Sequence, residues 1–431
     1  MTLLDRIANR NAKVCVIGLG YVGLPLAVEL ADAGYCVIGL DVDEERVGQL
    51  NEGVSYISDV PSSRLAGLVS AGRLRATADA AVLAEVDVID ICVPTPLRKT
   101  RDPDLSYVVG AIEAVARSLK PGQLVILEST TYPGTTEEVV RPMLEEGGLK
   151  GGVDFFLAFS PERVDPANPQ FNTRNIPKVV GGTDEVSTNL ARAFYGSFVD
   201  TVVPVSSTRV AEMVKLLENT FRAVNIGLAN EMALMCRNLD IDVWEVIDAA
   251  KTKPFGFMPF YPGPGLGGHC IPVDPHYLSW KARQNGFEAR FIELASYVNA
   301  SMPAYVVERV AAALNSQRKA INGSRIHVFG VSYKRDVGDL RESPALSILD
   351  SLAAKGARLS YTDPFVPELR HGDLELASVS ETDVLSSGTD CAVICTDHST
   401  FDYAAMVSRL PLIVDTRNAL KDHRAASIHR L

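Results

Sequence analysis

Short apolar runs alternate with helical patterns in the first part of this chain. The predicted strands cover residues 13–18, 35–41, 86–93, 123–127, 155–159 and 178–180. Helical patterns separate several of them, for example at residues 24–30 and 108–119. The runs lack alternation of apolar and polar positions, as is typical of parallel strands buried on both faces. This pattern predicts an α/β domain with a doubly wound sheet over residues 1–205.

The last part of the chain repeats this alternation. Its predicted strands are residues 324–330, a run that ends at 361–363, and the runs 391–395 and 412–415, with a helix after the first. We therefore expect a second doubly wound domain over residues 316–431. This domain has no glycine-rich turn after its first strand. A basic loop follows instead, and Lys334, Arg335 and Arg417 at predicted strand ends suit a nucleotide diphosphate.

Helical patterns fill the middle of the chain. One pattern covers residues 206–236 without an internal proline, and another covers about 275–313. Asp242 and Glu245 are spaced like the N-terminal cap of a helix between them. The prediction is therefore two Rossmann-like domains joined by a central helical segment, 206–315, which we expect to form a dimer interface.

Composition narrows the class of protein. The chain has 431 residues, 47% of them hydrophobic and 22% charged, which indicates a soluble globular protein of several domains. Its formal net charge of −11 argues against nucleic acid or an anionic membrane as a partner. The N-terminus lacks a hydrophobic signal core, and the cysteines are odd in number without a CxxC pair. We expect a cytoplasmic protein.

A GxGxxG turn follows the first predicted strand and precedes a helix. In this setting the glycines form the turn and admit a pyrophosphate to the helix N-terminus. Asp41, after the second strand, would accept hydrogen bonds from a ribose diol and repel a 2′-phosphate, so NAD is favoured over NADP. Arg46 would cover the adenine side, although arginine can also hold a 2′-phosphate. The expected cofactor contacts here are Gly18, Gly20, Tyr21, Val22, Gly23, Asp41 and Arg46.

Polar residues follow three of the apolar runs at their carboxyl ends, where open α/β sheets bind ligands. They include Thr95, Thr130 and Glu162. Further along, Lys215, Asn219 and Arg222 share one face of the predicted long helix. They form either a solvated stripe or a set of donors for an anionic ligand.

A glycine-rich loop, residues 263–268, leads to Cys270, and Asp274 follows one helical turn later. Few Cβ atoms in this loop let the backbone approach a ligand closely. Cys270 is either a buried, inert side chain or a nucleophile. A zinc site built from His269, Cys270, Asp274 and His276 is a weaker reading, because two of these ligands are adjacent; we expect no metal.

Several motifs, in this order, resemble the UDP-glucose/GDP-mannose dehydrogenase family along nearly the whole chain. They are GLGYVG at 18–23, ESTTYPG at 128–134, SPE at 160–162, Lys215 with Asn219, GGHC at 267–270 with Asp274, and the basic stretch 334–341. The tract 253–272, together with SPERVDP at 160–166, most resembles the branch that oxidises UDP-N-acetylglucosamine at C6. The segment after SPE and the stretch around Asp336 depart from the UDP-glucose members.

The resemblance implies NAD-dependent oxidation of the C6 hydroxyl of a UDP-sugar to the acid, through thiohemiacetal and thioester intermediates on Cys270. It also implies a product that feeds surface polysaccharide synthesis and a homodimer or higher homo-oligomer. The implied catalytic residues are Cys270, Lys215, Asn219, Asp274, Glu162 and Thr130. Thr95, Thr130 and Arg341 join the cofactor set. The implied substrate contacts are Arg163, Val164, Lys215, Asn219, Arg222, Gly267, Lys334, Arg335 and Arg417.

Three alternatives stay open. UDP-N-acetylmannosamine or UDP-glucose are alternative substrates, and Arg163, Val164, Arg222 and Arg335 also fit the former. An NAD-dependent nucleotide-sugar epimerase is the alternative of a different class. An epimerase would need a Tyr-x-x-x-Lys pair beside the nicotinamide, and none occurs near the cofactor elements.

Overall fold

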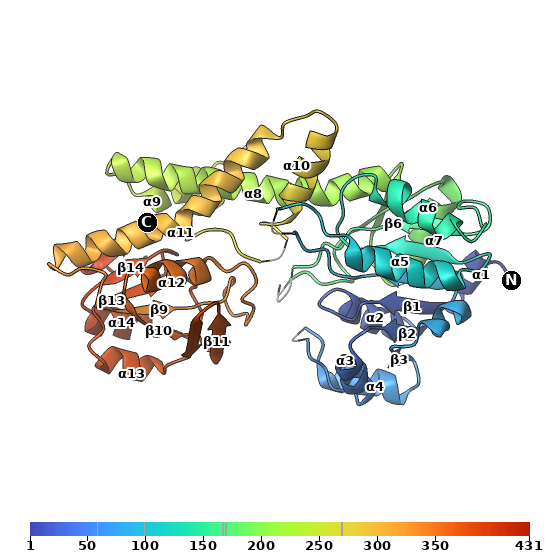
Figure 1. Cartoon of the computed structure of the whole chain (residues 1–431), viewed down its shortest axis with the longest axis horizontal. Helices are drawn as coiled ribbons and strands as arrows, with labels where there is room; N and C mark the ends of the chain where they lie inside the picture. The colour runs from blue at the N-terminus through green and yellow to red at the C-terminus, as the bar shows by residue number, and fades with distance from the viewer. Residues whose placement is uncertain (58, 99, 166–167, 169, 269) are drawn as a thin grey trace. The chain divides into compact units, whose positions relative to one another are not determined.

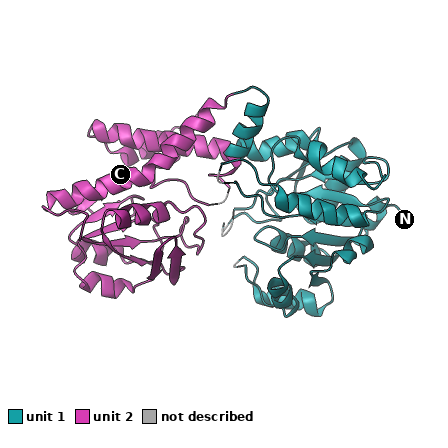
Figure 2. Ribbon diagram, viewed as in Figure 1, with its two compact units in different colours: residues 1–218, 276–287 teal, residues 219–275, 288–431 magenta. Residues whose placement is uncertain are grey.

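The computed structural model describes residues 1–57, 59–98, 100–165, 168, 170–268 and 270–431. Figure 1 labels its helices and strands. The chain divides into two compact units (Figure 2). Unit 1 comprises residues 1–218 and 276–287, and unit 2 comprises residues 219–275 and 288–431.

Unit 1 is built on a sheet of eight strands in the described part of the chain, in the order β3-β2-β1-β4-β5-β6-β7-β8. The strands are β1 Lys13–Ile17, β2 Cys36–Leu40, β3 Leu74–Thr77, β4 Val88–Ile91, β5 Leu124–Leu127, β6 Phe156–Phe159, β7 Lys178–Gly182 and β8 Val202–Pro204. β1 pairs in parallel with both β2 and β4, so the strand order reverses beside β1. Ligands of open α/β sheets bind at such a switch point.

The strand at residues 178–180 is present, but its predicted direction is wrong. β7 pairs antiparallel with β6, and β8, which the pattern did not predict, pairs in parallel with β7. Two parallel neighbours need a crossover connection, usually a helix. The described residues between β6 and β7 contain no helix, and an antiparallel pair needs none.

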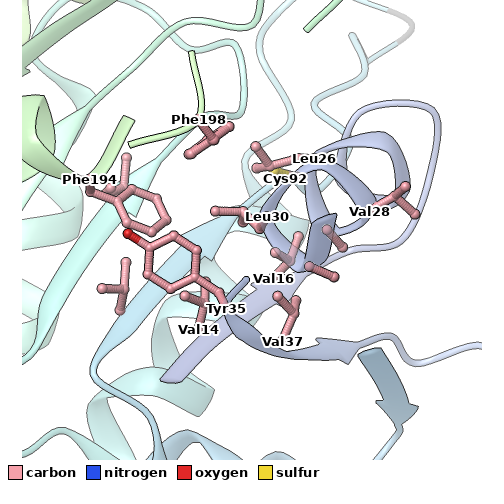
Figure 3. Close-up of a cluster of buried hydrophobic side chains, with 14 of the residues drawn as sticks. Val14, Val16, Leu26, Val28, Leu30, Tyr35, Val37, Cys92, Phe194 and Phe198 are labelled. Atoms are coloured by element: carbon pink, nitrogen blue, oxygen red, sulfur yellow. The ribbon is translucent and has the colours of Figure 1, made fainter. Parts of the chain in front are cut away.

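Alternate residues of β1 point to opposite faces of this sheet, and helices cover both faces. Val14 and Val16 pack with Leu26, Leu30 and Phe194 in one core cluster (Figure 3). Cys15 and Ile17 belong to a second cluster, which includes Val108 and Ile112 of α5. Covering both faces explains why the strands read as continuous apolar runs.

Two helices expected from the sequence are present in unit 1: α2 after β1 and α5 before β5. The helices that precede the middle of the chain are α1 Leu3–Ala8, α2 Gly23–Asp32, α3 Glu44–Asn51, α4 Ser62–Ser70, the 3₁₀ helix η1 Ala80–Glu85, α5 Ser106–Ser118, the π-helical turn η2 Thr136–Val140, α6 Arg141–Glu145 and α7 Glu185–Tyr195.

Long helices form the middle of the chain, as predicted. They are α8 Thr208–Asn238, α9 Val243–Ala250, α10 Asp274–Gln284 and α11 Arg290–Ser316. Asp242 caps α9, because its side chain accepts from the backbone N–H groups of Trp244 and Glu245. The single helix expected at 275–313 is wrong: α10 and α11 are separate, and Gly286 between them has φ +74°, which no helix interior accommodates.

Unit 2 holds the second doubly wound sheet, with the strand order β10-β9-β13-β14-β15. Its strands are β9 Arg325–Phe329, β10 Arg358–Thr362, β13 Cys391–Ile394, β14 Ile413–Asp415 and β15 Ile428–Arg430, and β11 Glu368–His371 with β12 Leu374–Ala377 forms a separate hairpin. Its helices are α12 Pro344–Ala354, α13 Glu381–Ser386 and α14 Tyr403–Arg409. The predicted fold class is therefore confirmed. Within the described residues, no helix combines the length and apolar character that a membrane span requires.

Candidate active site

The glycine turn after β1 is shaped by close backbone approaches in unit 1. Gly18 has φ +87°, and a Cβ atom there would lie 2.8 Å from the carbonyl oxygen of Cys92. A Cβ on Gly23 would lie 1.8 Å from the carbonyl oxygen of Gly18. Gly20, in contrast, faces open space, with no other atom within 4 Å of such a Cβ. The turn therefore needs glycine for its own geometry at two positions and leaves room at the third.

A pocket opens beside this turn, between α3 and the residues that follow it. Its lining residues are Gly20, Tyr21, Asp43, Glu45, Arg46, Gln49, Tyr56 and Ile57. The guanidinium of Arg46 pairs with Asp43 at 3.2 Å and lies 5.7 Å from the ring centroid of Tyr56. An aromatic ring, a cation and open backbone suit the adenosine half of a dinucleotide, so the residues present fit NAD.

Asp41 follows β2 at the predicted place but is largely buried. Its carboxylate accepts from the backbone N–H groups of Leu19 at 2.7 Å and Asp43 at 3.0 Å. These bonds hold the carboxylate against the glycine turn. Sequence reasoning missed Asp43 and Tyr56, because no motif marks them; they line the pocket only through the path of the chain after α3.

Glu162 and Lys215 come together in unit 1. The ammonium of Lys215, on α8, donates to the backbone carbonyl of Glu162 at 2.5 Å. Oε1 of Glu162 accepts from the N–H groups of Arg163 at 2.7 Å and Val164 at 2.5 Å. Burial opposes ionisation of Glu162, but the ammonium of Lys178, the N–H groups of Val164 and Arg163 and the charge of Lys215 together outweigh it, and the pKa of this carboxyl lies below its ordinary value. Glu162 is thus a fixed anion after β6.

Other predicted residues of unit 1 lie at carboxyl ends of strands. Thr95 follows β4, and its carbonyl accepts from the hydroxyl of Tyr277 at 2.9 Å. Tyr277 and Lys281 have the Tyr-x-x-x-Lys spacing, so the expectation that no such pair lies near the cofactor elements is wrong. Tyr277 is fully buried and Lys281 is held by Glu138 at 2.6 Å, so both have structural partners. Thr130 follows β5 and is half-buried. The guanidinium of Arg163 is held by Glu218 of α8 at 2.6 Å and by the carbonyl of Pro177.

Asn219 and Asp274 come together in unit 2. Both side chains are buried, and the Asn219 amide donates to Oδ2 of Asp274 at 2.5 Å. Asp274 begins α10, and its backbone N–H donates to the carbonyl of Cys270 at 2.8 Å. Cys270 therefore lies directly before a helix, with a partly exposed side chain. Arg222, the third residue of the predicted stripe, is exposed, whereas Lys215 and Asn219 are buried.

The glycine loop before Cys270 packs against residues that follow β9. A Cβ on Gly267 would lie 2.6 Å from the Cβ of Tyr333, and a Cβ on Gly268 would lie 2.9 Å from the ring of Tyr333. The N–H of Gly268 donates to the carbonyl of Arg341 at 3.0 Å. Two motifs far apart in the sequence, the glycine loop and the basic loop, are therefore in direct contact.

The remaining cations of unit 2 differ in their surroundings. Arg417, after β14, lies against the glycine loop, since a Cβ on Gly263 would lie 2.8 Å from its Nη1. Arg417 also donates to the carbonyl of Cys395 at 2.8 Å. Lys334 is half-buried, whereas Arg335 is exposed and pairs with Asp397, and Arg341 pairs with Asp339. His269, part of the GGHC motif and of the weaker zinc reading, lies outside the described residues.

A buried polar cluster lies behind Glu162, and of its members sequence reasoning marked only Glu128, as part of ESTTYPG. It comprises Asp90 of β4, Glu128 after β5, Lys178 of β7 and Tyr195 of α7. Asp90 and Lys178 each occur within an apolar run, and a charged residue in a buried strand was the available signal. Only the topology shows that they meet.

Comparison with known proteins identifies the family. The models of the UDP-glucose/GDP-mannose dehydrogenase family match this chain in three parts. The NAD binding domain matches residues 12–199, the central domain residues 209–301 and the UDP binding domain residues 327–422.

Named relatives match over most of the chain. A UDP-N-acetyl-D-mannosamine dehydrogenase of Pyrococcus horikoshii is 38% identical, covering 97% of this chain and 98% of the relative. A UDP-N-acetyl-D-glucosamine 6-dehydrogenase of Pseudomonas aeruginosa is also 38% identical, covering 83% of this chain and 84% of the relative. The solved structure of the UDP-D-ManNAc dehydrogenase from Pyrococcus horikoshii has a TM-score of 0.89 at 36% identity, covering 97% and 98% of the two chains. The chain belongs to the UDP-glucose/GDP-mannose dehydrogenase family and is an NAD-dependent nucleotide-sugar dehydrogenase.

Proposed function

We propose that this protein oxidises the C6 hydroxyl of a UDP-N-acetylhexosamine to a carboxylate, and that UDP-N-acetylglucosamine is its substrate. The observation that supports this chemistry best is the placement of Cys270. A partly exposed thiol lies directly before α10, after a loop that packs tightly through its glycines, and beside the buried Asn219–Asp274 pair. An alcohol dehydrogenase that stopped at the aldehyde would not need a nucleophile there.

The reaction divides into two oxidations and a hydrolysis. In the first oxidation the C6 hydroxyl gives up a proton to a base, for which we propose the neutral amine form of Lys215, acting through a water held by Asp274; the ammonium formed in this way is the donor in the later steps. When held by the turn and pocket residues of unit 1, NAD⁺ would supply the hydride acceptor, one molecule for each of the two oxidations. The sulfur of Cys270 then adds to the aldehyde carbon, and the resulting thiohemiacetal keeps the aldehyde bound until its second oxidation to a thioester.

Lys215 and Asn219 are proposed to donate to the oxygen that becomes negative in these steps. Both side chains are buried, which strengthens a hydrogen bond to a developing charge. Each such donor contributes roughly 3 kcal/mol in comparable sites. Lys215 donates to the carbonyl of Glu162, so its amino group is already oriented before substrate binds.

Hydrolysis releases the product and restores the thiol. Water adds to the thioester carbon, the C–S bond breaks, and the sulfur regains a proton. We propose that the Glu162 carboxylate accepts the proton of this water, with Thr130 and Asp274 positioning it. The lowered pKa of Glu162 keeps this carboxyl ionised, so it has an oxygen available to accept the proton.

Two sets of binding residues are proposed, one for each ligand. For NAD we propose the turn and pocket residues Gly18, Gly20, Tyr21, Val22, Gly23, Asp41 and Arg46, with Thr95, Thr130 and Arg341. For the UDP-sugar we propose Arg163, Val164, Arg222, Gly267, Lys334, Arg335 and Arg417. We also propose that the product feeds surface polysaccharide synthesis and that the enzyme works in the cytoplasm.

UDP-N-acetylmannosamine is the second candidate substrate. The relatives named for its oxidation include matches that cover 95–97% of this chain, compared with 83% for the relative named for UDP-N-acetylglucosamine. The test is NADH formation with UDP-N-acetylglucosamine, UDP-N-acetylmannosamine, UDP-N-acetylgalactosamine, UDP-glucose and GDP-mannose. The highest kcat/KM should fall on UDP-N-acetylglucosamine. Preference for the mannosamine epimer would overturn this choice and leave the proposed chemistry intact.

We propose a homodimer that forms through the helical segment of unit 2. Phe221, Leu228 and Met235 are exposed at intervals of seven along α8, so they share one face. Phe291, Leu294 and Tyr297 of α11 are exposed as well, with Phe291 at 77% and Tyr297 at 75%. A second copy would cover these apolar side chains with the same surface of its own. Light scattering should give a dimer for the wild type and a monomer for Leu228→Lys; a monomeric wild type would refute it.

A further inference from the structure

Lys178 lies between two carboxylates in the interior of unit 1. Its Nζ is 2.8 Å from Oε1 of Glu128 and 3.4 Å from Oε2 of Glu162. The exposed fractions of these side chains are 6% for Lys178, 0% for Glu128 and 14% for Glu162. The ammonium is therefore shielded from water, and it contacts Oε2 of Glu162, whereas two backbone N–H groups hold Oε1.

The contacts continue inward from Glu128. The hydroxyl of Tyr195 lies 2.5 Å from Oε1 of Glu128 and 2.9 Å from Oδ2 of Asp90. A phenol has one hydrogen, so it donates fully to one of these carboxyl groups. The contact with the other carboxyl group is a hydrogen bond only when that carboxyl group is protonated and donates to the phenol oxygen. The result is a continuous chain of contacts, Asp90–Tyr195–Glu128–Lys178–Glu162.

The proton belongs on Asp90. Burial, and then the nearby charge of Glu128, raise the pKa of Asp90 well above its ordinary value. Burial also raises the pKa of Glu128, but Lys178 opposes that shift. Burial opposes the charge on Lys178, yet Glu128 and Glu162 outweigh it and raise the pKa of the ammonium. With Asp90 neutral, the ammonium of Lys178 pairs with two ionised carboxylates, those of Glu128 and Glu162.

Ligand atoms of Asp90, Cys92 and Glu128 lie within 4.8 Å of one another, close enough for a metal ion. The ammonium of Lys178 already supplies a positive charge 2.8 Å from Glu128. Burial, and then Glu128, also raise the pKa of the Cys92 thiol, so this sulfur stays protonated. A protonated thiol and a neutral Asp90 are poor metal ligands. The cluster is built around the lysine.

We propose that Lys178 is a positioning residue for Glu162: its ammonium, braced by Glu128, holds the Glu162 carboxylate in the orientation used for thioester hydrolysis. This role rests on the proposed function of Glu162. The groups that face Glu162 or Lys178 are Glu128 from the end of β5, Asp90 and Cys92 at β4, Tyr195 on α7 and Lys215 on α8. The fold therefore fixes a reacting group through a residue that sequence motifs do not mark.

The test compares Glu128→Gln with the double variant Lys178→Met/Glu128→Gln. The single variant keeps the ammonium beside Glu162. The double variant removes the ammonium of Lys178 together with the carboxylate of Glu128. The net charge of the buried cluster therefore stays the same as in the wild type, and Glu162 is the only carboxylate left without the ammonium. Lys178→Met alone leaves two unpaired carboxylates and is destabilised, so it is not used.

The readout is the pH dependence of the acid-forming step, measured by single-turnover release of product from the thioester. We expect the acid limb of Glu128→Gln to lie at or below that of the wild type, because the variant loses the like charge of Glu128 and keeps the ammonium. In the double variant it should move upward by about one pH unit or more, because Glu162 loses the charge that favours its ionisation. Lys178→Arg/Glu128→Gln should restore the lower midpoint. The same midpoint in both glutamine variants would overturn the proposal.

A second readout separates this proposal from the function itself. The carboxylate band of Glu162, identified by infrared difference spectra against Glu162→Gln, reports its titration without turnover. If Glu162→Gln hydrolyses the thioester normally, the proposed role of Glu162 fails, whatever the infrared titration shows. If that variant is inactive but the Glu162 band titrates alike with and without Lys178, the role of Lys178 fails alone.

Discussion

The amide of Asn219 donates to the carboxylate of Asp274 at 2.5 Å, and this bond joins α8 to the first residue of α10. Both side chains are buried, so the bond is shielded from water. The backbone N–H of Asp274 in turn holds the carbonyl of Cys270. One buried pair thus connects the long helix to the segment that presents the thiol.

Asn219→Asp should lower turnover by about 10²-fold, because the variant loses a donor and places two carboxylates together. It should also lower the midpoint of thermal unfolding. Steady-state NADH formation and a thermal melt measure the two effects. Asn225→Asp is the matched control on the same helix, since Asn225 bonds only to the carbonyl of Phe221 among the contacts described for it, and the control should keep both properties. Equal behaviour of the two variants would contradict a special role for Asn219.

Cys270→Ser should abolish formation of the uronic acid, with a loss of more than about 10³-fold, because a hydroxyl is a far weaker nucleophile than a thiolate. The wild type should consume two NAD⁺ per sugar, measured by NADH absorbance against product by mass spectrometry. Cys36→Ser, which changes an exposed cysteine at the start of β2, should keep wild-type rates. Full acid production by the Cys270 variant, or a ratio of one NAD⁺ per sugar, would rule out the thioester route.

Gly267→Ala should reduce both stability and turnover. The added methyl group would lie 2.6 Å from the Cβ of Tyr333, so the loop before Cys270 has to move. Overpacking of this kind costs typically about 1–3 kcal/mol. Thermal melts and NADH formation measure the effects. Gly147→Ala places the same methyl group in open space on the surface and should change neither. An unaffected Gly267 variant would show that the contact with Tyr333 is not needed.

His327 should make the second sheet sensitive to acid. The ring is buried between the hydroxyls of Ser360 and Thr362, and burial lowers its pKa to about 3. The unfolded chain takes up a proton near pH 6.5, so the folded state loses stability as the pH falls from about 6.5 toward 3. The slope is at most about 1.4 kcal/mol per pH unit.

Calorimetry at pH 7 and pH 5 tests this sign. The unfolding temperature of the wild type should fall more between these values than that of His327→Gln, which has no titrating ring. His371→Gln, on the hairpin of β11 and β12, controls for the loss of a histidine and should follow the wild type. A wild type and a His327 variant that fall equally would refute the assignment.

Local chemistry made most of the architecture predictable. Buried parallel strands need apolar side chains on both faces, so β1, β2, β4, β5 and β6 could be read as runs. The turn at Gly18 and Gly23 could be recognised because the backbone passes too close for any side chain. The reversed direction of β7 could not be read, since a strand has the same pattern in either direction. The domain boundaries 1–205, 206–315 and 316–431 stay predictions.

The sequence by itself marked the residues to which we assign the chemistry: the cofactor turn, the thiol of Cys270 and the helix face with Lys215 and Asn219. Each is marked by its own residue types and spacing, which depend on neighbours along the chain. The tertiary structure alone decided which of them meet. Lys178 reaches Glu162, and Gly267 reaches Tyr333, because separate strands and loops converge in space, and no local pattern records a contact between segments so far apart.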